Sequence, residues 1–274
     1  MTATAQEAFL RGFHAQHPAV TSRFMARGRA ADGRSSYEIL RDRVHGRRRV
    51  LDLGCGDGLL LELLAGSESD EREVAGVDLS PAELELARRR PLLADAALLE
   101  ARAQDLPFTD GSFDACVSHM ALMLMSDVEQ VAAEVARVLR PGGVLAVALG
   151  GGAVGGEAYE LFLRLLRPVV EAVPPGQRIP TLGDRRTRDR DGLDAVLGPA
   201  GFMPVGWDTV RIDLSGSIEQ VWETVSGLYD LGPLDARTIG TLRARFAAEA
   251  RTEARSDGTI ACAMKAHIAT SRLR

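Results

Sequence analysis

The sequence predicts an α/β protein built on a doubly wound sheet. Between residues 50 and 149, short apolar runs typical of buried strands alternate with helix-length segments. The first of these strands leads directly into three glycines at alternate positions. Strands that alternate with helices pair in parallel through right-handed crossovers, which produces a doubly wound arrangement. With 274 residues and 46% hydrophobic content, the chain is long enough to bury a full core.

The chain is predicted to begin with helices. Apolar residues recur at helical spacing between Glu7 and Arg29 and are interrupted by Pro18, which predicts two short helices. A further helix is expected to start at Ser35 or Ser36 and to run to Val44.

The first strand and its glycines, Val50–Gly58 with the sequence VLDLGCGDG, predict a ligand pocket. The apolar residues suit a buried parallel strand, and Gly54, Gly56 and Gly58 let the backbone turn tightly and approach a ligand without Cβ atoms in the way. Asp52 places a carboxylate near the carboxyl end of this strand, where ligands of open α/β sheets bind.

The glycine spacing indicates which kind of cofactor binds. In a dinucleotide fingerprint, GxGxxG, the third glycine would fall at position 59, which is Leu59 here. A second strand, Val74 to Leu79, carries Asp78 at its end, placed to accept hydrogen bonds from two ribose hydroxyls. This combination fits a nucleoside without phosphates.

The remaining elements follow in alternation. Ser80 begins a helix with a capping box to Glu83 and with Pro81 at its first position. Further helices are expected at residues 59–64, 128–139, 157–173 and 193–200 and over most of 217–255, and further strands at 97–103, 113–118, 144–149, 202–214 and 259–269.

Five motifs in this order resemble those of the class I S-adenosylmethionine-dependent methyltransferases that act on small molecules. Val50–Gly58 resembles the first motif of that family, and Asp78 resembles its ribose-binding acid. Ala103–Phe108 is similar to the adenine-binding segment, Phe113–Met120 to the fourth strand and its exit toward the methyl group, and Leu139–Gly143 to the turn before the fifth strand. These motifs cover about a third of the chain.

The resemblance implies a seven-stranded Rossmann-like sheet whose last two strands form an antiparallel edge hairpin. It divides the chain into an N-terminal helical cap at 1–46, a cofactor-binding core at 47–149, and a remainder at 150–274 with substrate-cap insertions at about 150–190 and 217–255. The N-terminal helices would lie over the cofactor, or simply pack on the sheet edge. The residues implied to bind S-adenosyl-L-methionine are Asp52, Gly54, Cys55, Gly56, Asp78, Leu79, Gln104, Asp105, Leu106 and Ser118.

The implied reaction is displacement at the methyl carbon of a sulfonium. The cofactor carries the difficult chemistry, and the protein contributes alignment and exclusion of water. His119 follows the fourth strand, where the methyl group should project, so it is the candidate general base. Its alternative role is to pack its ring beside the cofactor. His14 and His17 would reach the same pocket from the N-terminal helices, or lie exposed on the surface.

Motifs that are absent from the sequence exclude some classes of methyl acceptor. The fourth strand ends in Ser118-His119-Met120-Ala121 rather than in the Asn/Asp-Pro-Pro motif of amino-methyltransferases acting on adenine or glutamine amides. No cluster of acids has the spacing of a magnesium site, so no metal is predicted. A small metabolite methylated on O, N or C remains. The loop from Arg185 to Arg190 is expected to be a solvated mixed-charge loop, or to recognise a carboxylate or phosphate.

Composition restricts the partners. The net charge of −5 and the single lysine, Lys265, argue against a nucleic-acid partner, because clustered cations supply affinity for phosphate backbones. The three cysteines are odd in number and far apart, as expected of reduced thiols. No run of eighteen apolar residues occurs, and no signal peptide is evident, so we expect a cytoplasmic monomer or homodimer without a membrane partner.

Three classes of function follow from these features. The first is a small-molecule methyltransferase of the specialised-metabolite, antibiotic type. The second is a protein of the same fold that binds the cofactor but catalyses a non-methylating cyclisation or elimination. The third is a nicotinamide-dependent oxidoreductase, which Leu59 and the lack of a Ser, Tyr and Lys catalytic arrangement disfavour.

Overall fold

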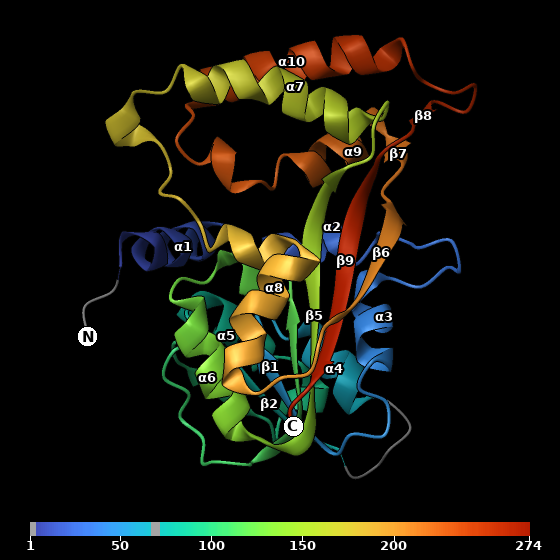
Figure 1. Ribbon diagram of the computed structural model, residues 1–274. Helices are drawn as coiled ribbons and strands as arrows, with labels where there is room; N and C mark the ends of the chain where they lie inside the picture. Colours follow the sequence, from blue (N-terminus) through green and yellow to red (C-terminus); the bar gives the residue numbers. More distant parts are fainter. Residues whose placement is uncertain (1–3, 67–71) are drawn as a thin grey trace.

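A seven-stranded sheet with the order β3-β2-β1-β4-β5-β9-β6 runs through the molecule in the computed structural model, which describes residues 4–66 and 72–274 (Figure 1). The first five strands pair in parallel, and β9 enters antiparallel between β5 and β6. This confirms the predicted doubly wound sheet and its antiparallel edge. The strands are β1 (Arg49–Leu53), β2 (Glu73–Asp78), β3 (Ala97–Glu100), β4 (Phe113–His119), β5 (Leu139–Ala153), β6 (Gly206–Asp213) and β9 (Ala263–Arg272).

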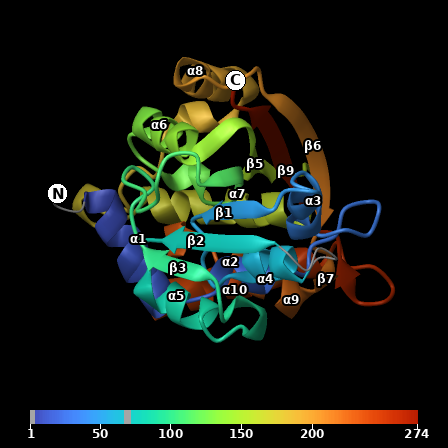
Figure 2. The same cartoon turned by 90° about the horizontal axis from the view of Figure 1, so that it is seen from below.

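Helices cover both faces of this sheet, as Figure 2 shows from below. Successive side chains of a strand point to opposite faces. Val50 therefore packs toward one helical layer, whereas Leu51 and Leu53 pack toward the other. The first layer holds α3 (Ser36–Asp42), α4 (Leu59–Ala65) and α5 (Pro81–Ala87), and the second holds α6 (Val128–Val138) and α8 (Arg190–Leu197).

The N-terminal segment folds into two helices, α1 (Ala5–Gln16) and α2 (Val20–Met25), as predicted. Thr4 caps α1 in a capping box with Glu7, and the chain turns at Pro18 before α2 begins. The next helix, α3, begins at Ser36 with Ser35 as its cap, also as predicted.

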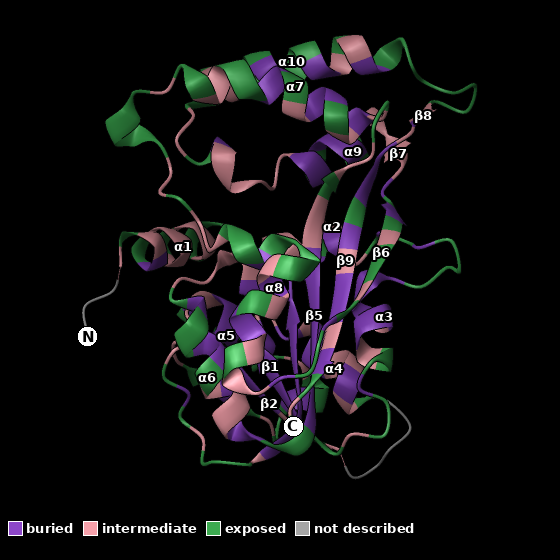
Figure 3. Ribbon diagram, viewed as in Figure 1, coloured by how far each residue is buried: buried purple, intermediate pink, exposed green. Residues whose placement is uncertain are grey.

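A second group of helices forms a cap beyond the sheet. β5 and β9 run on from the core to this cap, which contains α7 (Ala158–Glu171), α9 (Ile218–Val225) and α10 (Ala236–Arg251) (Figure 1). Phe162 of α7, Trp222 of α9 and Phe246 of α10 form an aromatic cluster in which each ring contacts the other two, with centroids 5.7 to 6.1 Å apart. Figure 3 shows buried positions at the cap end of β9 and on the cap helices, and one cluster of buried apolar residues includes members of both, so core and cap share one apolar interior.

Short elements complete the chain. A two-stranded ladder pairs β7 (Gly216–Ser217) with β8 (Thr259–Ile260) at the base of the cap. No helix among the described residues is long and apolar enough to cross a membrane. The 3-10 turns are η1 (Pro91–Leu93), η2 (Leu122–Leu124), η3 (Pro175–Gln177), η4 (Arg185–Arg188), η5 (Gly198–Ala200) and η6 (Tyr229–Leu231).

Several predicted boundaries were wrong. The glycines after Leu149 belong to β5, which pairs with β9 as far as Ala153. Gly151 allows this pairing because a Cβ there would lie 2.6 Å from the His267 ring. The predicted strand at 259–269 is two strands, since the chain passes from β8 to β9 after residue 260. The predicted strands at 97–103 and 202–214 are shorter, ending at Glu100 and beginning at Gly206.

Candidate active site

The glycine loop after β1 joins the carboxyl ends of β1 and β2. The amides of Gly54 and Cys55 both donate to the carbonyl of Val77, at 2.9 and 3.0 Å. Gly54 has φ +76°, and a Cβ there would lie 2.5 Å from the Cβ of Ala121, so only glycine fits. Gly56, with φ +53°, has no atom within 4 Å of an added Cβ. The loop therefore leaves open space beside Gly56, where a ligand can approach the backbone.

Asp78 ends β2 at this loop. Its carboxylate accepts hydrogen bonds from the amides of Gly56 and Ser80, both at 2.8 Å. Burial raises the pKa of Asp78, while these two hydrogen bonds act in the opposite direction. A carboxylate has about four acceptor sites, so Asp78 can accept further hydrogen bonds from a ligand.

Asp52 lies at the floor of the same site and is 1% exposed. Its Oδ1 has no hydrogen-bond partner among residues 4–66 and 72–274. Burial, reinforced by the charges of Asp78 and Asp57, raises the pKa of Asp52 well above its ordinary value. A buried acceptor without a partner is costly, so this position is suited to a ligand that brings a donor or a positive charge.

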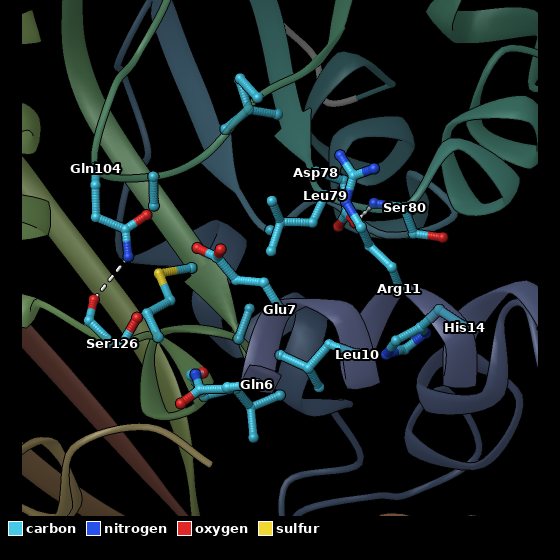
Figure 4. A pocket seen from close by; sticks show the side chains of 17 residues that line it. Gln6, Glu7, Leu10, Arg11, His14, Asp78, Leu79, Ser80, Gln104 and Ser126 are labelled. Carbon is cyan, nitrogen blue, oxygen red and sulfur yellow. Dashed lines mark hydrogen bonds between the residues drawn. The ribbon is translucent and has the colours of Figure 1, made fainter. Parts of the chain in front are cut away.

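The helix α1 closes the site from the other side. Figure 4 shows Gln6, Glu7, Leu10, Arg11 and His14 of this helix facing a pocket opposite Asp78, Leu79 and Gln104. The Gln6 side chain donates to the carbonyl of Leu124, and Arg102 pairs with Glu7 at 2.7 Å. The Gln104 amide donates to the Ser126 carbonyl at 2.7 Å. The result is a mainly apolar slot with polar groups at its edges.

His119 occupies a closed position at the end of β4. Its ring stacks on Tyr37 and its Nε2 lies 2.9 Å from the Ser36 hydroxyl. Its Nδ1 has no hydrogen-bond partner in the described part of the chain. Burial lowers the pKa of His119 to about 3. The ring is therefore neutral near pH 7 and a weak proton acceptor there, which favours the packing alternative over the predicted general base.

Backbone strain marks the residue that follows. Met120 has φ +55°, an uncommon conformation for a residue other than glycine, and its amide donates to the Ala148 carbonyl at 2.8 Å. Strained backbone is found preferentially at functional sites. Met120 turns the chain out of β4, and it lines both the pocket that contains Asp52 and a larger hollow described below.

Sequence reasoning missed a hydrogen-bonded chain that links three elements. His14 of α1 lies 2.7 Å from Glu83 of α5 through Nδ1, and 3.0 Å from the Tyr229 hydroxyl of η6 through Nε2. The His14 side chain is only 18% exposed, so it is not a surface histidine. The predicted capping box of α5 is only half formed, because Glu83 binds His14 and the amide of Ala19 instead. The partners of the Glu83 carboxylate lie 64 and more positions away, where no local pattern points to them.

The predicted cofactor residues fall into two groups. Asp105 is exposed, Leu106 is buried with its amide bonded to Glu134, and the Ser118 hydroxyl donates to the Leu53 carbonyl at 2.7 Å. These three do not line the two pockets at the glycine loop. The residues that do line them are Asp52, Gly54, Cys55, Gly56, Asp78, Leu79 and Gln104.

A larger hollow adjoins these pockets between the core and the cap. Its wall includes Phe24 of α2, Tyr159 of α7 and the segment from Ile179 to Leu182. Thr21, Met120, Leu124 and Tyr229 line both this hollow and the pocket that contains Asp52. Two ligands bound in the adjoining cavities would meet at Met120. Within the described residues, no group of three His, Cys, Asp or Glu side chains is arranged to hold a metal ion.

The family follows from comparison with known proteins. A model described as a methyltransferase domain matches residues 51–147. The O-methyltransferase rstn1 of Aspergillus nomiae is 31% identical over 176 residues, which cover 62% of this chain and 70% of that protein. The chain belongs to the S-adenosylmethionine-dependent methyltransferases, a family of enzymes. The demethylmenaquinone methyltransferase of Thermus thermophilus is 39% identical over 102 residues, or 36% of this chain, and the match spans less than half of that protein, at 46%.

A solved structure supports the same fold for this methyltransferase. The [4+2]-cyclase SpnF superposes with a TM-score of 0.58 and 20% identity, covering 100% of this chain and 97% of that one. The predicted family and fold are thus confirmed. The cofactor common to the family, S-adenosylmethionine, is a nucleoside without phosphates, in agreement with the glycine spacing at Leu59. The oxidoreductase alternative is excluded by the family.

Proposed function

We propose that this methyltransferase binds S-adenosyl-L-methionine at the glycine loop and methylates a small molecule held between core and cap. The observation that carries the proposal is the unpartnered Oδ1 of Asp52, buried at the floor of a pocket that adjoins the larger hollow. Oxygen is the acceptor atom to test first, because the relative rstn1 is named an O-methyltransferase.

The residues present fit the proposed cofactor. Asp52 would face the amino group of the cofactor. This group is positively charged and would give the Asp52 carboxylate the hydrogen-bond donor that its Oδ1 lacks among the described residues. Asp78 would accept hydrogen bonds from the ribose hydroxyls, and the slot beside Leu79 and Gln104 would hold the adenine ring. The open space beside Gly56 leaves room for the nucleoside. When bound, the cofactor supplies a methyl group activated by the sulfonium.

The chain's own contribution is position and exclusion of water. The helix α1 covers the slot, and the strained turn at Met120 lies where the cofactor pocket adjoins the acceptor hollow. Orientation of this kind contributes roughly 7–11 kcal/mol to a two-substrate reaction. We assign His119 a positioning role through its contacts with Tyr37 and Ser36, because its low pKa makes it a weak base.

Calorimetric titration tests the proposal first. We expect micromolar binding of S-adenosylmethionine and S-adenosylhomocysteine and no binding of NAD. A screen of hydroxyl-bearing, amine-bearing and activated-carbon acceptors would then be followed by mass spectrometry for a gain of one methyl group. Failure of both adenosyl compounds to bind would refute the proposal.

A second function is favoured by one comparison. Because the chain superposes over its full length on a cyclase, the second candidate is a protein that binds the cofactor and promotes a non-methylating cyclisation or elimination. The discriminating measurement is the amount of S-adenosylhomocysteine formed per product. Methyl transfer yields one equivalent, whereas a cyclisation consumes no cofactor.

A further inference from the structure

The acceptor hollow carries positively charged groups that the proposed methyl transfer does not require. Arg185 and Arg188 both line it, and neither lines the cofactor pockets. In the parts of the chain that the structure describes, no carboxylate pairs with either guanidinium. Their neighbour Arg186 differs, since it pairs with Asp184 at 2.6 Å and with Glu129 at 2.7 Å.

The local geometry explains why these two arginines face the same way. They are the first and last residues of η4, a 3-10 turn. Side chains three residues apart in such a turn lie one above the other, so Arg185 and Arg188 share a face while Arg186 points elsewhere.

The turn is held in place by its neighbours. Thr187 is fully buried, and its hydroxyl donates to the Asp184 carbonyl at 2.7 Å. Gly183 packs so closely on η2 that a Cβ there would lie 2.0 Å from the Met123 carbonyl oxygen. Its amide donates to the Gln6 side chain at 3.2 Å. Two guanidinium groups are therefore presented to the hollow from a fixed support, not from a free loop.

Charge is distributed unevenly between the adjoining cavities. The pocket that contains Asp52 and adjoins the hollow is lined by four carboxylates, those of Asp52, Asp57, Asp78 and Glu83. Among the described residues of the hollow, Asp230 is the one carboxylate, against the two arginines. Burial raises the pKa of Asp230, which favours its neutral form. In a chain of net charge −5, this is a local reversal of sign.

We propose that Arg185 and Arg188 form an anion-binding site within the acceptor hollow, so that the acceptor is an apolar molecule bearing a carboxylate or phosphate. The inference rests on the proposed function. Guanidinium groups bind both anions through paired hydrogen bonds. The apolar part of the acceptor would contact Phe24, Met123 and Leu228, which line the same hollow.

The test compares probes that share one alkyl chain. Octanoate, octyl phosphate and octan-1-ol are titrated into the full-length protein by calorimetry, with and without saturating S-adenosylhomocysteine. We expect at least one anionic probe to bind tenfold or more tightly than octan-1-ol. The preferred probe distinguishes a carboxylate from a phosphate, and the preference should shrink between 50 and 500 mM salt, because exposed charges are screened.

Two double variants complete the design. Arg185→Gln/Arg188→Gln should reduce the anion preference to within twofold of octan-1-ol. The control Arg190→Gln/Arg243→Gln removes the same charge from exposed positions outside the hollow and should keep the preference. Equal affinity for all three probes overturns the inference, and so does the absence of binding by any of them. A preference for anions that persists in Arg185→Gln/Arg188→Gln also overturns it.

The two proposals fail separately. If S-adenosylhomocysteine binds but no anion preference appears, only the anion site is refuted. If S-adenosylhomocysteine does not bind, the proposed methyl transfer is refuted, while the titrations without it still report on the arginines.

Discussion

The imidazole of His119 lies flat against the ring of Tyr37, with centroids 3.7 Å apart and planes inclined by 18°. Both residues are buried, and Tyr37 belongs to α3 while His119 ends β4. This stack joins the N-terminal segment to the sheet at the pocket that contains Asp52, which both rings line. It also keeps the imidazole away from water, which is why its pKa is low.

The His119 pKa predicts a dependence of stability on pH. The folded-state value of about 3 lies below the ordinary 6.5, so the neutral ring stabilises the fold above pH 6.5 and this contribution is lost as the pH falls toward 3. Each pH unit in that window costs up to about 1.4 kcal/mol. Denaturant titrations at pH 7, 5.5 and 4.5 should show a steeper loss for the wild type than for His119→Gln. Parallel curves would contradict the burial argument.

Turnover supplies a second readout on His119. His119→Gln should leave the affinity for S-adenosylhomocysteine within about threefold and slow the reaction by misplacing neighbouring groups, with no change in the shape of the pH–rate profile. A profile that loses an ionisation near pH 6.5 in the variant would restore the general-base role.

Replacing Asp52 should affect binding and stability in opposite directions. Its raised pKa means that the protonated form stabilises the fold below about pH 4 and that this is lost as the pH rises. Asp52→Asn should therefore be more stable than the wild type at pH 8, by about 1–3 kcal/mol, and no more stable at pH 3. The same variant should bind S-adenosylhomocysteine more weakly but 5′-methylthioadenosine, which lacks the amino group, equally well.

Asp78→Ala should weaken the binding of both S-adenosylhomocysteine and 5′-methylthioadenosine, because the two ligands share the ribose. Loss of two hydrogen bonds to a carboxylate is on the order of 2–4 kcal/mol. Asp105→Ala is a matched control, since Asp105 is exposed and lies outside the pockets. Calorimetric affinities within twofold of the wild type for Asp78→Ala would remove Asp78 from the site.

Gly56→Val should abolish cofactor binding by filling the space beside the loop. The change also strains the backbone at φ +53°, so its control must carry similar strain elsewhere. Gly111→Val serves this purpose, because Gly111 has φ +64°, no atom within 4 Å of an added Cβ, and a position outside the two pockets at the glycine loop. Circular dichroism checks the fold of both variants. Retained binding by Gly56→Val would place the nucleoside elsewhere.

Tyr229→Phe should loosen the contact between the cap and α1. It removes the hydroxyl that bonds to His14 but keeps the ring, which packs edge-on against Phe13 at 4.7 Å. We expect a loss of about 0.5–1.5 kcal/mol in unfolding free energy. Hydrogen exchange should rise in residues 5–16 and 229–231 specifically, and uniform protection in these segments would show that the hydroxyl contributes nothing.

Local sequence patterns were sufficient for the centre of the fold. The run from Val50 to Gly58 contains both the buried strand and the three glycines of its turn, all of which have positive φ. The close contacts that also require glycine at positions 54 and 58, with Ala121 and with Ala87 and Leu93, lie elsewhere in the chain. The strand at residues 113–118 was predictable for the same reason, since its side chains are buried on both faces.

Local sequence patterns did not predict the direction in which the side chains of the candidate site point. Asp105 and Leu106 follow Gln104 in sequence, yet only Gln104 lines the pocket, because the turn there points its successors to solvent and to the core. Ser118 precedes His119 but its hydroxyl faces β1. The chain from Glu83 through His14 to Tyr229 joins residues up to 215 positions apart, and it exists only once three elements are packed together.

The antiparallel pairing of β6 with β9 has a consequence for how this enzyme diversifies. Asp213, the last residue of β6, lies opposite Ala263, the first residue of β9. The whole cap segment between them, including α9 and α10, is thus an enlarged hairpin connection. Its two ends are pinned side by side by the sheet, so its length and sequence can change without shifting any strand register. In the proposed function, the residues of this connection that line the hollow, Gly227 to Asp230, can vary while the strands that carry Asp52 and Asp78 stay fixed.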